Sequence, residues 1–238
     1  MLVAGTTAQP ATRRNAARRF GALAGLLAGP FFLASVGLNT WASLDYLHSL
    51  GWKFVGGEEV PWPSSLARGP YGWVQVATFL ITGLLVVVVA AGLRGVLPRG
   101  RTGTLAVALL GLLGAALMLA AFRVDVPMLT GGEPQTPNGL LHGIAFLLII
   151  GAGVLAPLAM ALAVRRDTSW RPILLVSVSA AVLFIVFLLL PWGNATFLLA
   201  MATLFAWIAV VAARLRQPRE EDRSSRSASG SERAAGAS

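Results

Sequence analysis

The chain alternates between long apolar runs and short polar stretches. A helix that crosses a bilayer needs about 20 consecutive, predominantly apolar residues. Six runs meet that length, and they cover residues 20–42, 71–97, 103–122, 137–164, 170–190 and 195–213. The pattern therefore predicts an all-α polytopic membrane protein, a bundle of six transmembrane helices that occupies residues 20–213.

Both ends of the chain are polar. Residues 1–19 form a basic segment, and the run after it is too long for the apolar part of a cleaved signal peptide. We interpret that run as a signal anchor. Residues 214–238 are rich in Arg, Ser, Glu and Gly and have almost no apolar side chains to bury, so we expect a disordered tail.

The basic residues are distributed unevenly among the connections. If both termini lie on one side, 16 of the 19 Lys and Arg residues lie on that side, and the other side holds Lys53, Arg68 and Arg123. Connections rich in Lys and Arg stay in the cytoplasm. The sequence therefore predicts a multi-pass protein of the cell membrane with cytoplasmic N- and C-termini.

Composition supports the membrane assignment and narrows the partners. Only 12% of the residues are charged, against about 25% in soluble domains. The net charge of +9 does not indicate nucleic-acid binding, because the arginines lie at the ends of apolar runs and in the tail. The expected partners are the lipid bilayer and a lipid or small-molecule ligand, with no nucleic acid.

Arginine far outnumbers lysine, and with the Ala, Gly and Leu content this favours a bacterial source. The chain has no cysteine, which excludes disulfides and thiolate chemistry.

A stripe of small and weakly polar residues follows one face of the first span. Such residues let a neighbouring helix approach closely, and in lipid this packing drives helix association. The stripe continues beyond the apolar run to Asp45 and His48. Its members within the span are Gly21, Gly25, Ala28, Phe32, Ser35, Asn39 and Ala42.

The connection over residues 46–70 is the longest one, and its Gly and Pro content argues against a regular helix. Its tryptophans, Trp52 and Trp62, and Trp73 just after it suit the boundary between acyl chains and water.

The polar stretch between the third and fourth spans, residues 122–146, contains the main candidate site. Thr136 is expected to be the N-cap of the fourth span, with Pro137 as its first residue. Asp125 follows the face that ends the third span, and His142 lies in the fourth span near its start. Because consecutive helices are antiparallel, we expect Asp125 and His142 to be neighbours joined by a hydrogen bond.

Short motifs in this region resemble those of the bacterial and archaeal membrane proteins grouped as domain of unknown function 998. The similar pieces are Ser65 to Trp73 (SLARGPYGW), Phe122 with Asp125, and Thr136, Gly139 and His142. Arg123 stands where members of the family often carry proline. The resemblance covers about residues 20–213, and it implies six helices in a membrane but no established activity.

Three roles are open for the candidate residues: catalysis, binding of a ligand or a metal ion, and a structural role. Asp125 could orient His142 as a general base for catalysis. The two could also bind a ligand together with Asp45, His48 and Thr136. With Asp45, His48, Glu58 or Glu59 they could hold a divalent metal.

A structural role is the third reading, in which Asp125 caps backbone N–H groups and His142 binds a carbonyl group. The sequence identifies no cofactor, and it contains none of the hydrolase motifs H-E-x-x-H or G-x-S-x-G. The leading hypothesis is a membrane protein that binds a lipid or small ligand at the extracytoplasmic ends of its helices. The alternative is a membrane-embedded, metal-dependent enzyme that acts on lipid-linked substrates at the outer interface. A transporter is least favoured, since few ionisable residues lie mid-membrane.

Overall fold

The computed structural model describes residues 9–52, 62–98, 100–130, 132–190 and 194–216, and these residues form helices but no strand. Among the described residues, six helices are long and apolar enough to cross a membrane, which confirms the predicted all-α bundle. They are α1 (Gln9–Ala42), α3 (Gly72–Leu93), α4 (Arg101–Leu119), α5 (Pro137–Val164), α6 (Arg171–Leu189) and α7 (Asn194–Leu215). Shorter elements occupy the connections: α2 (Leu44–Ser49) and the 3-10 helices η1 (Pro63–Arg68), η2 (Pro127–Thr130) and η3 (Thr168–Trp170).

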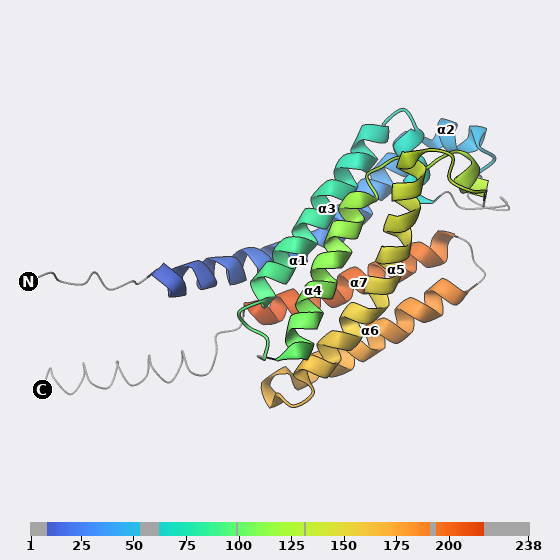
Figure 1. Ribbon diagram of the computed structural model, residues 1–238. Helices are drawn as coiled ribbons and strands as arrows, with labels where there is room; N and C mark the ends of the chain where they lie inside the picture. Colours follow the sequence, from blue (N-terminus) through green and yellow to red (C-terminus); the bar gives the residue numbers. More distant parts are fainter. Residues whose placement is uncertain (1–8, 53–61, 99, 131, 191–193, 217–238) are drawn as a thin grey trace, which may run out of the picture.

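The six long helices form one bundle (Figure 1), and their contacts close it into a ring. In order around it, α1 packs against α3, α3 against α4, α4 against α5, α5 against α6, and α6 against α7, which packs against α1. The Arg18 Nη2 atom donates to the Leu215 carbonyl oxygen at 3.2 Å, so the first and last helices meet where they approach the termini. We call this the termini end. The opposite end, where η1 packs against α3, is the η1 end.

Small residues lie where the helices cross. A Cβ atom at Gly25 of α1 would overlap the Cβ atom of Ala212 in α7, and one at Gly29 would lie 2.8 Å from the Phe205 Cβ atom. Between α3 and α4, a Cβ atom at Gly83 would lie 2.5 Å from the Gly114 carbonyl oxygen. The predicted stripe on the first span is therefore a contact face, although Ala42 at its far end is exposed.

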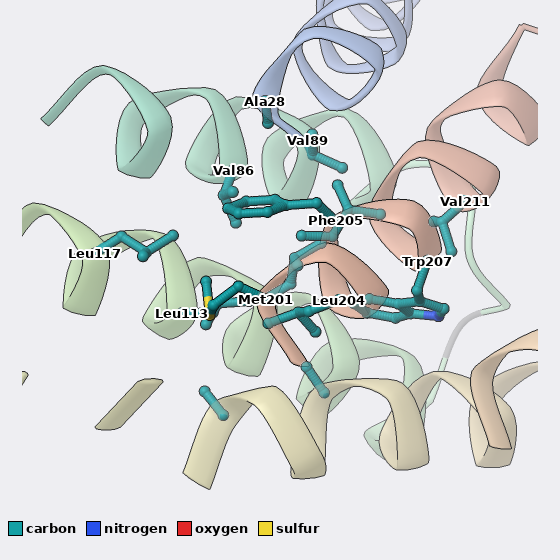
Figure 2. Close-up of a cluster of buried hydrophobic side chains, with 14 of the residues drawn as sticks. Ala28, Val86, Val89, Leu113, Leu117, Met201, Leu204, Phe205, Trp207 and Val211 are labelled. Atoms are coloured by element: carbon teal, nitrogen blue, oxygen red, sulfur yellow. The ribbon is translucent and has the colours of Figure 1, made fainter. Parts of the chain in front are cut away.

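Large apolar side chains fill the interior of the ring (Figure 2). They come from several helices, and α7 contributes half of the labelled set. The Trp207 Nε1 atom donates to the Ser177 Oγ atom of α6 at 2.9 Å, which satisfies the polar group of this buried ring. The labelled residues are Ala28, Val86, Val89, Leu113, Leu117, Met201, Leu204, Phe205, Trp207 and Val211.

Several boundaries differ from the predicted ones. The second span ends at Leu93 rather than at residue 97. Val96 and Leu97 lie in the turn that follows and are buried, so hydropathy alone does not separate these apolar residues from the helix. The first helix begins at Gln9, since its early residues include the strong helix formers Ala and Arg. The predicted disordered tail after Arg216 and the pair Glu58–Glu59 lie outside the described residues.

The long connection after α1 contains short helices that the sequence did not predict. Leu47 of α2 is fully buried, and η1 begins with Pro63 at its first position, where a missing N–H costs nothing. The aromatic ring of Trp62 contacts those of Phe146 and Phe197 at centroid distances of 5.6 and 5.2 Å, so it lies against α5 and α7. Trp73, in contrast, is 69% exposed, as an interfacial residue would be.

Candidate functional site

The Asp125 carboxylate organises the connection between α4 and α5. Its Oδ2 atom accepts hydrogen bonds from the backbone N–H groups of Gln135 and Thr136, both at 2.8 Å. Its Oδ1 atom accepts one from the Thr136 hydroxyl at 2.8 Å. The side chain is buried, and these bonds fasten the connection to the start of α5.

Thr136 is the N-cap of α5, as the sequence predicted. Its Oγ1 atom accepts a hydrogen bond from the backbone N–H of Gly139 at 3.2 Å, and Pro137 follows as the first helical residue. A Cβ atom at Gly139 would overlap the Asp125 Oδ2 atom. Glycine at this position therefore lets a carboxylate approach the first turn of the helix, where the helix dipole favours negative charge.

The same contacts set the acidity of Asp125. The hydrogen bond from the Thr136 hydroxyl lowers the pKa of the carboxyl group below its usual 3.8. The backbone N–H groups of Thr136 and Gln135 and the positive charge of Arg68 lower this pKa further, and burial opposes them. Arg68 itself is anchored by a 2.7 Å bond from its Nη1 atom to the Val124 carbonyl oxygen. Asp125 is thus built to be an anion that accepts hydrogen bonds.

His142 closes the other end of this connection. Its Nδ1 atom lies 2.8 Å from the Phe122 carbonyl oxygen and 3.0 Å from that of Ala120. Because both partners are acceptors, Nδ1 must carry the hydrogen. These carbonyl groups follow the last residue of α4, where a helix leaves its C=O groups without intrahelical partners. Within the described chain the Nε2 atom makes no hydrogen bond, so it is the ring nitrogen that can meet a ligand.

The expected hydrogen bond between Asp125 and His142 is not formed. Each side chain instead binds the unpaired backbone groups nearest to it: N–H groups before α5 for the carboxylate and C=O groups after α4 for the imidazole. This arrangement matches the structural reading of both residues. Their catalytic and ligand-binding roles stay predictions.

Asp45 and His48 lie on α2 and are both exposed. The His48 ring stacks on the Trp52 ring, with a centroid distance of 5.8 Å and an interplanar angle of 16°. Among the described residues, no group of three or more His, Cys, Asp or Glu side chains could hold a metal ion. The predicted metal site would need Glu58 or Glu59, which are not described.

Gln75 is the polar residue with the most unusual surroundings, and it was not among the residues predicted from the sequence. Gln75 is fully buried in the first turn of α3, and neither its Oε1 nor its Nε2 atom has a hydrogen-bond partner within the described chain. The Thr82 hydroxyl two turns along is also buried and unpartnered, whereas the Thr78 hydroxyl donates to the Val74 carbonyl oxygen at 2.8 Å. Gln75, Thr78 and Thr82 are spaced by three and four residues, which places them in a row on one face of α3. This spacing in the sequence could have revealed the row.

A third buried polar group lies on α1. The Asn39 Nδ2 atom has no partner in the described chain, while its Oδ1 atom accepts a hydrogen bond from the Ser43 hydroxyl at 3.2 Å. Both Asn39, near the end of α1, and Gln75, near the start of α3, are close to the η1 end.

Comparison with known proteins gave one match. A family model described as "Protein of unknown function (DUF998)" matches residues 63–216, which is more than half of the chain. The matched part begins at η1 and runs through α7, so it includes Gln75, Asp125, Thr136 and His142 but not Asn39, Asp45 or His48. Neither a curated protein nor a solved structure matches the sequence.

Proposed function

We propose that this integral membrane protein, which belongs to the DUF998 family, binds a lipid or small ligand by hydrogen bonds near the η1 end of its bundle. Because the function of that family is unknown, the proposal rests on the residues of this chain alone. The observation that carries it is the carboxamide of Gln75, fully buried with both polar atoms unpartnered.

A buried polar group without a partner is costly. Leaving one hydrogen-bonding group unsatisfied costs about 1–3 kcal/mol, and the burial of Gln75 inside the bundle keeps its amide from bulk water. A buried group left without a partner therefore calls for an explanation. A ligand held against Gln75 would supply that partner.

The chemistry of the row indicates the kind of ligand. A carboxamide both donates and accepts hydrogen bonds. Thr82, on the same helix, adds an unpartnered hydroxyl, and Asn39 on α1 has an unpartnered amide nitrogen. None of these groups carries a charge. They suit an uncharged polar group with hydroxyl, carbonyl or amide functions, on a lipid or on a small molecule.

One observation favours the alternative, a membrane-embedded enzyme that acts on lipid-linked substrates. The Nδ1–H group of His142 points at carbonyl oxygens, so in the neutral ring the Nε2 atom holds the lone pair of a base or a metal ligand. If this alternative is right, elemental analysis should find stoichiometric metal that is lost in His142→Gln. The binding proposal requires no metal.

The test of the binding proposal is Gln75→Leu, which keeps the side-chain volume and removes the amide. In ligand-free detergent solution we expect this variant to be more stable than the wild type by about 1–3 kcal/mol, since an unsatisfied group has been removed. Native mass spectrometry of gently extracted protein should show a bound lipid or small molecule on the wild type and much less on the variant.

Thr78→Val is the matched control, because it lies on the same face but loses a hydroxyl that already has a partner. It should keep the bound molecule. If Gln75→Leu were stabilised yet retained the molecule, or if no molecule were found on either protein, ligand binding at Gln75 would be excluded.

We also propose that both termini lie in the cytoplasm, on the basis of the uneven distribution of basic residues. The chain has no cysteine, so single cysteines can be introduced at Ser49 and Thr102, which are both exposed. In intact cells an impermeant thiol reagent should label Ser49→Cys, at the η1 end, and not Thr102→Cys, at the termini end. Permeabilised cells, in which both must react, are the control. Labelling of Thr102→Cys in intact cells would reverse the topology.

A further inference from the structure

A cleft of about 490 Å³ opens at the termini end, between the end of α3 and the start of α4. Its lining includes Arg94 together with the apolar side chains of Leu97, Val107 and Ala108. It is separate from Gln75 and Asp125, which belong to the other end of the bundle.

Two glycines give the cleft its shape. A Cβ atom at Gly103 would overlap the Pro98 carbonyl oxygen, so glycine lets the connection fold back onto the first turn of α4. Gly100 has a φ angle of 151°, a conformation that other residues rarely adopt. The cleft is therefore part of the packed structure of this turn, with Leu97 buried beneath it.

Arg94 is the charged residue among the described residues that line the cleft. It is exposed, and within the described chain its guanidinium makes no hydrogen bond or ion pair. Two other arginines at this end bind backbone carbonyl groups: Arg18 donates to the Leu215 carbonyl oxygen and Arg214 to that of Ser169. What sets Arg94 apart from the exposed arginines of the neighbouring connections is its place in the lining of the cleft. Arg94 is thus an uncompensated cation at the boundary of two membrane-crossing helices.

We propose that this cleft binds the headgroup of an anionic phospholipid in the leaflet at the termini end. The Arg94 guanidinium suits the phosphate group, with which arginine forms paired hydrogen bonds. The apolar side chains of Val107 and Ala108 in the cleft suit the first segment of an acyl chain. A free phosphate ion would use the cation but gain nothing from those side chains.

The test measures phospholipid binding to the purified full-length protein by native mass spectrometry. Wild-type protein should bind dioleoyl-phosphatidylglycerol more tightly than dioleoyl-phosphatidylcholine, and Arg94→Gln should weaken phosphatidylglycerol binding about fivefold. Arg123→Gln is the matched control, since it removes the same charge from an exposed site near the opposite end of α4. It should leave the affinity unchanged.

A second variant fills the cleft without changing charge. Ala108 is exposed on α4, so Ala108→Phe should fold normally and still weaken phosphatidylglycerol binding. Inorganic phosphate at millimolar concentration should not compete. Equal losses in Arg94→Gln and Arg123→Gln, unchanged binding in Ala108→Phe, or displacement of the lipid by inorganic phosphate would each overturn the proposal.

Discussion

Replacing Gly83 by alanine is expected to destabilise the bundle by about 1–3 kcal/mol. The new Cβ atom would lie 2.5 Å from the Gly114 carbonyl oxygen and 2.8 Å from the Met118 backbone nitrogen. Backbone atoms cannot move aside as a flexible side chain can, so α3 and α4 must separate. In lipid this removes the close packing that holds the two helices together.

Gly151→Ala is the matched control for this prediction. A Cβ atom at Gly151, in the middle of α5, would meet nothing within 4 Å. Because alanine favours a helix over glycine by about 1 kcal/mol, this variant should be slightly more stable than the wild type. The two substitutions are thus expected to change the detergent-denaturation midpoint in opposite directions. A shift of the same sign in both would show that Gly83 does not mark a close helix crossing.

Asp125→Ala is expected to lower the denaturation temperature by several degrees. The substitution leaves the N–H groups of Gln135 and Thr136 and the Thr136 hydroxyl without their acceptor. Since Thr136 also caps α5, the first turn of that helix should fray. Thermal unfolding of the purified protein, with hydrogen exchange of the 132–139 segment, measures both effects.

The same contacts predict a pH dependence. Because the pKa of Asp125 is lowered in the folded protein, its charge stabilises the fold fully above the unfolded pKa, near 3.8. That contribution is lost as the pH falls below 3.8 and through the lower pKa of the folded state. Asp125→Asn should lack this part of the acid sensitivity.

Glu133→Gln is the control for both effects, because Glu133 is an exposed carboxylate in the same connection. It should match the wild type in thermal stability and in acid sensitivity. An Asp125→Asn protein with the acid sensitivity of the wild type would contradict the assigned role of the charge.

The spans and the start of α5 could be predicted because their causes are local. Apolar runs of sufficient length specify helices in a bilayer, and Thr136 followed by Pro137 specifies a helix start. The end of α3 could not, since Val96 and Leu97 are buried by the turn after the helix rather than by the helix itself. Local sequence does not distinguish these two kinds of burial.

The contacts of the candidate site depend on the path of the chain. The face occupied by Asp125 followed from helix periodicity, but its choice of Gln135 and Thr136 over His142 depends on how the connection folds back. Whether the Gln75 amide has a hydrogen-bond partner likewise depends on all the elements that pack around α3. A single sequence identifies a polar residue in an apolar run, but not the absence of a partner.

The closed ring has a consequence for biogenesis. The seam between α1 and α7 joins the first and the last of the six described spans in sequence order, so it can form only after the four spans between them have entered the membrane. Until then the α1 surface around Gly25 and Gly29 faces lipid. The small residues of that surface carry no charge, so they can remain in contact with acyl chains until α7 packs against them. We therefore expect a nascent chain truncated before α7 to remain inserted but open, and more sensitive to membrane proteases than the complete ring.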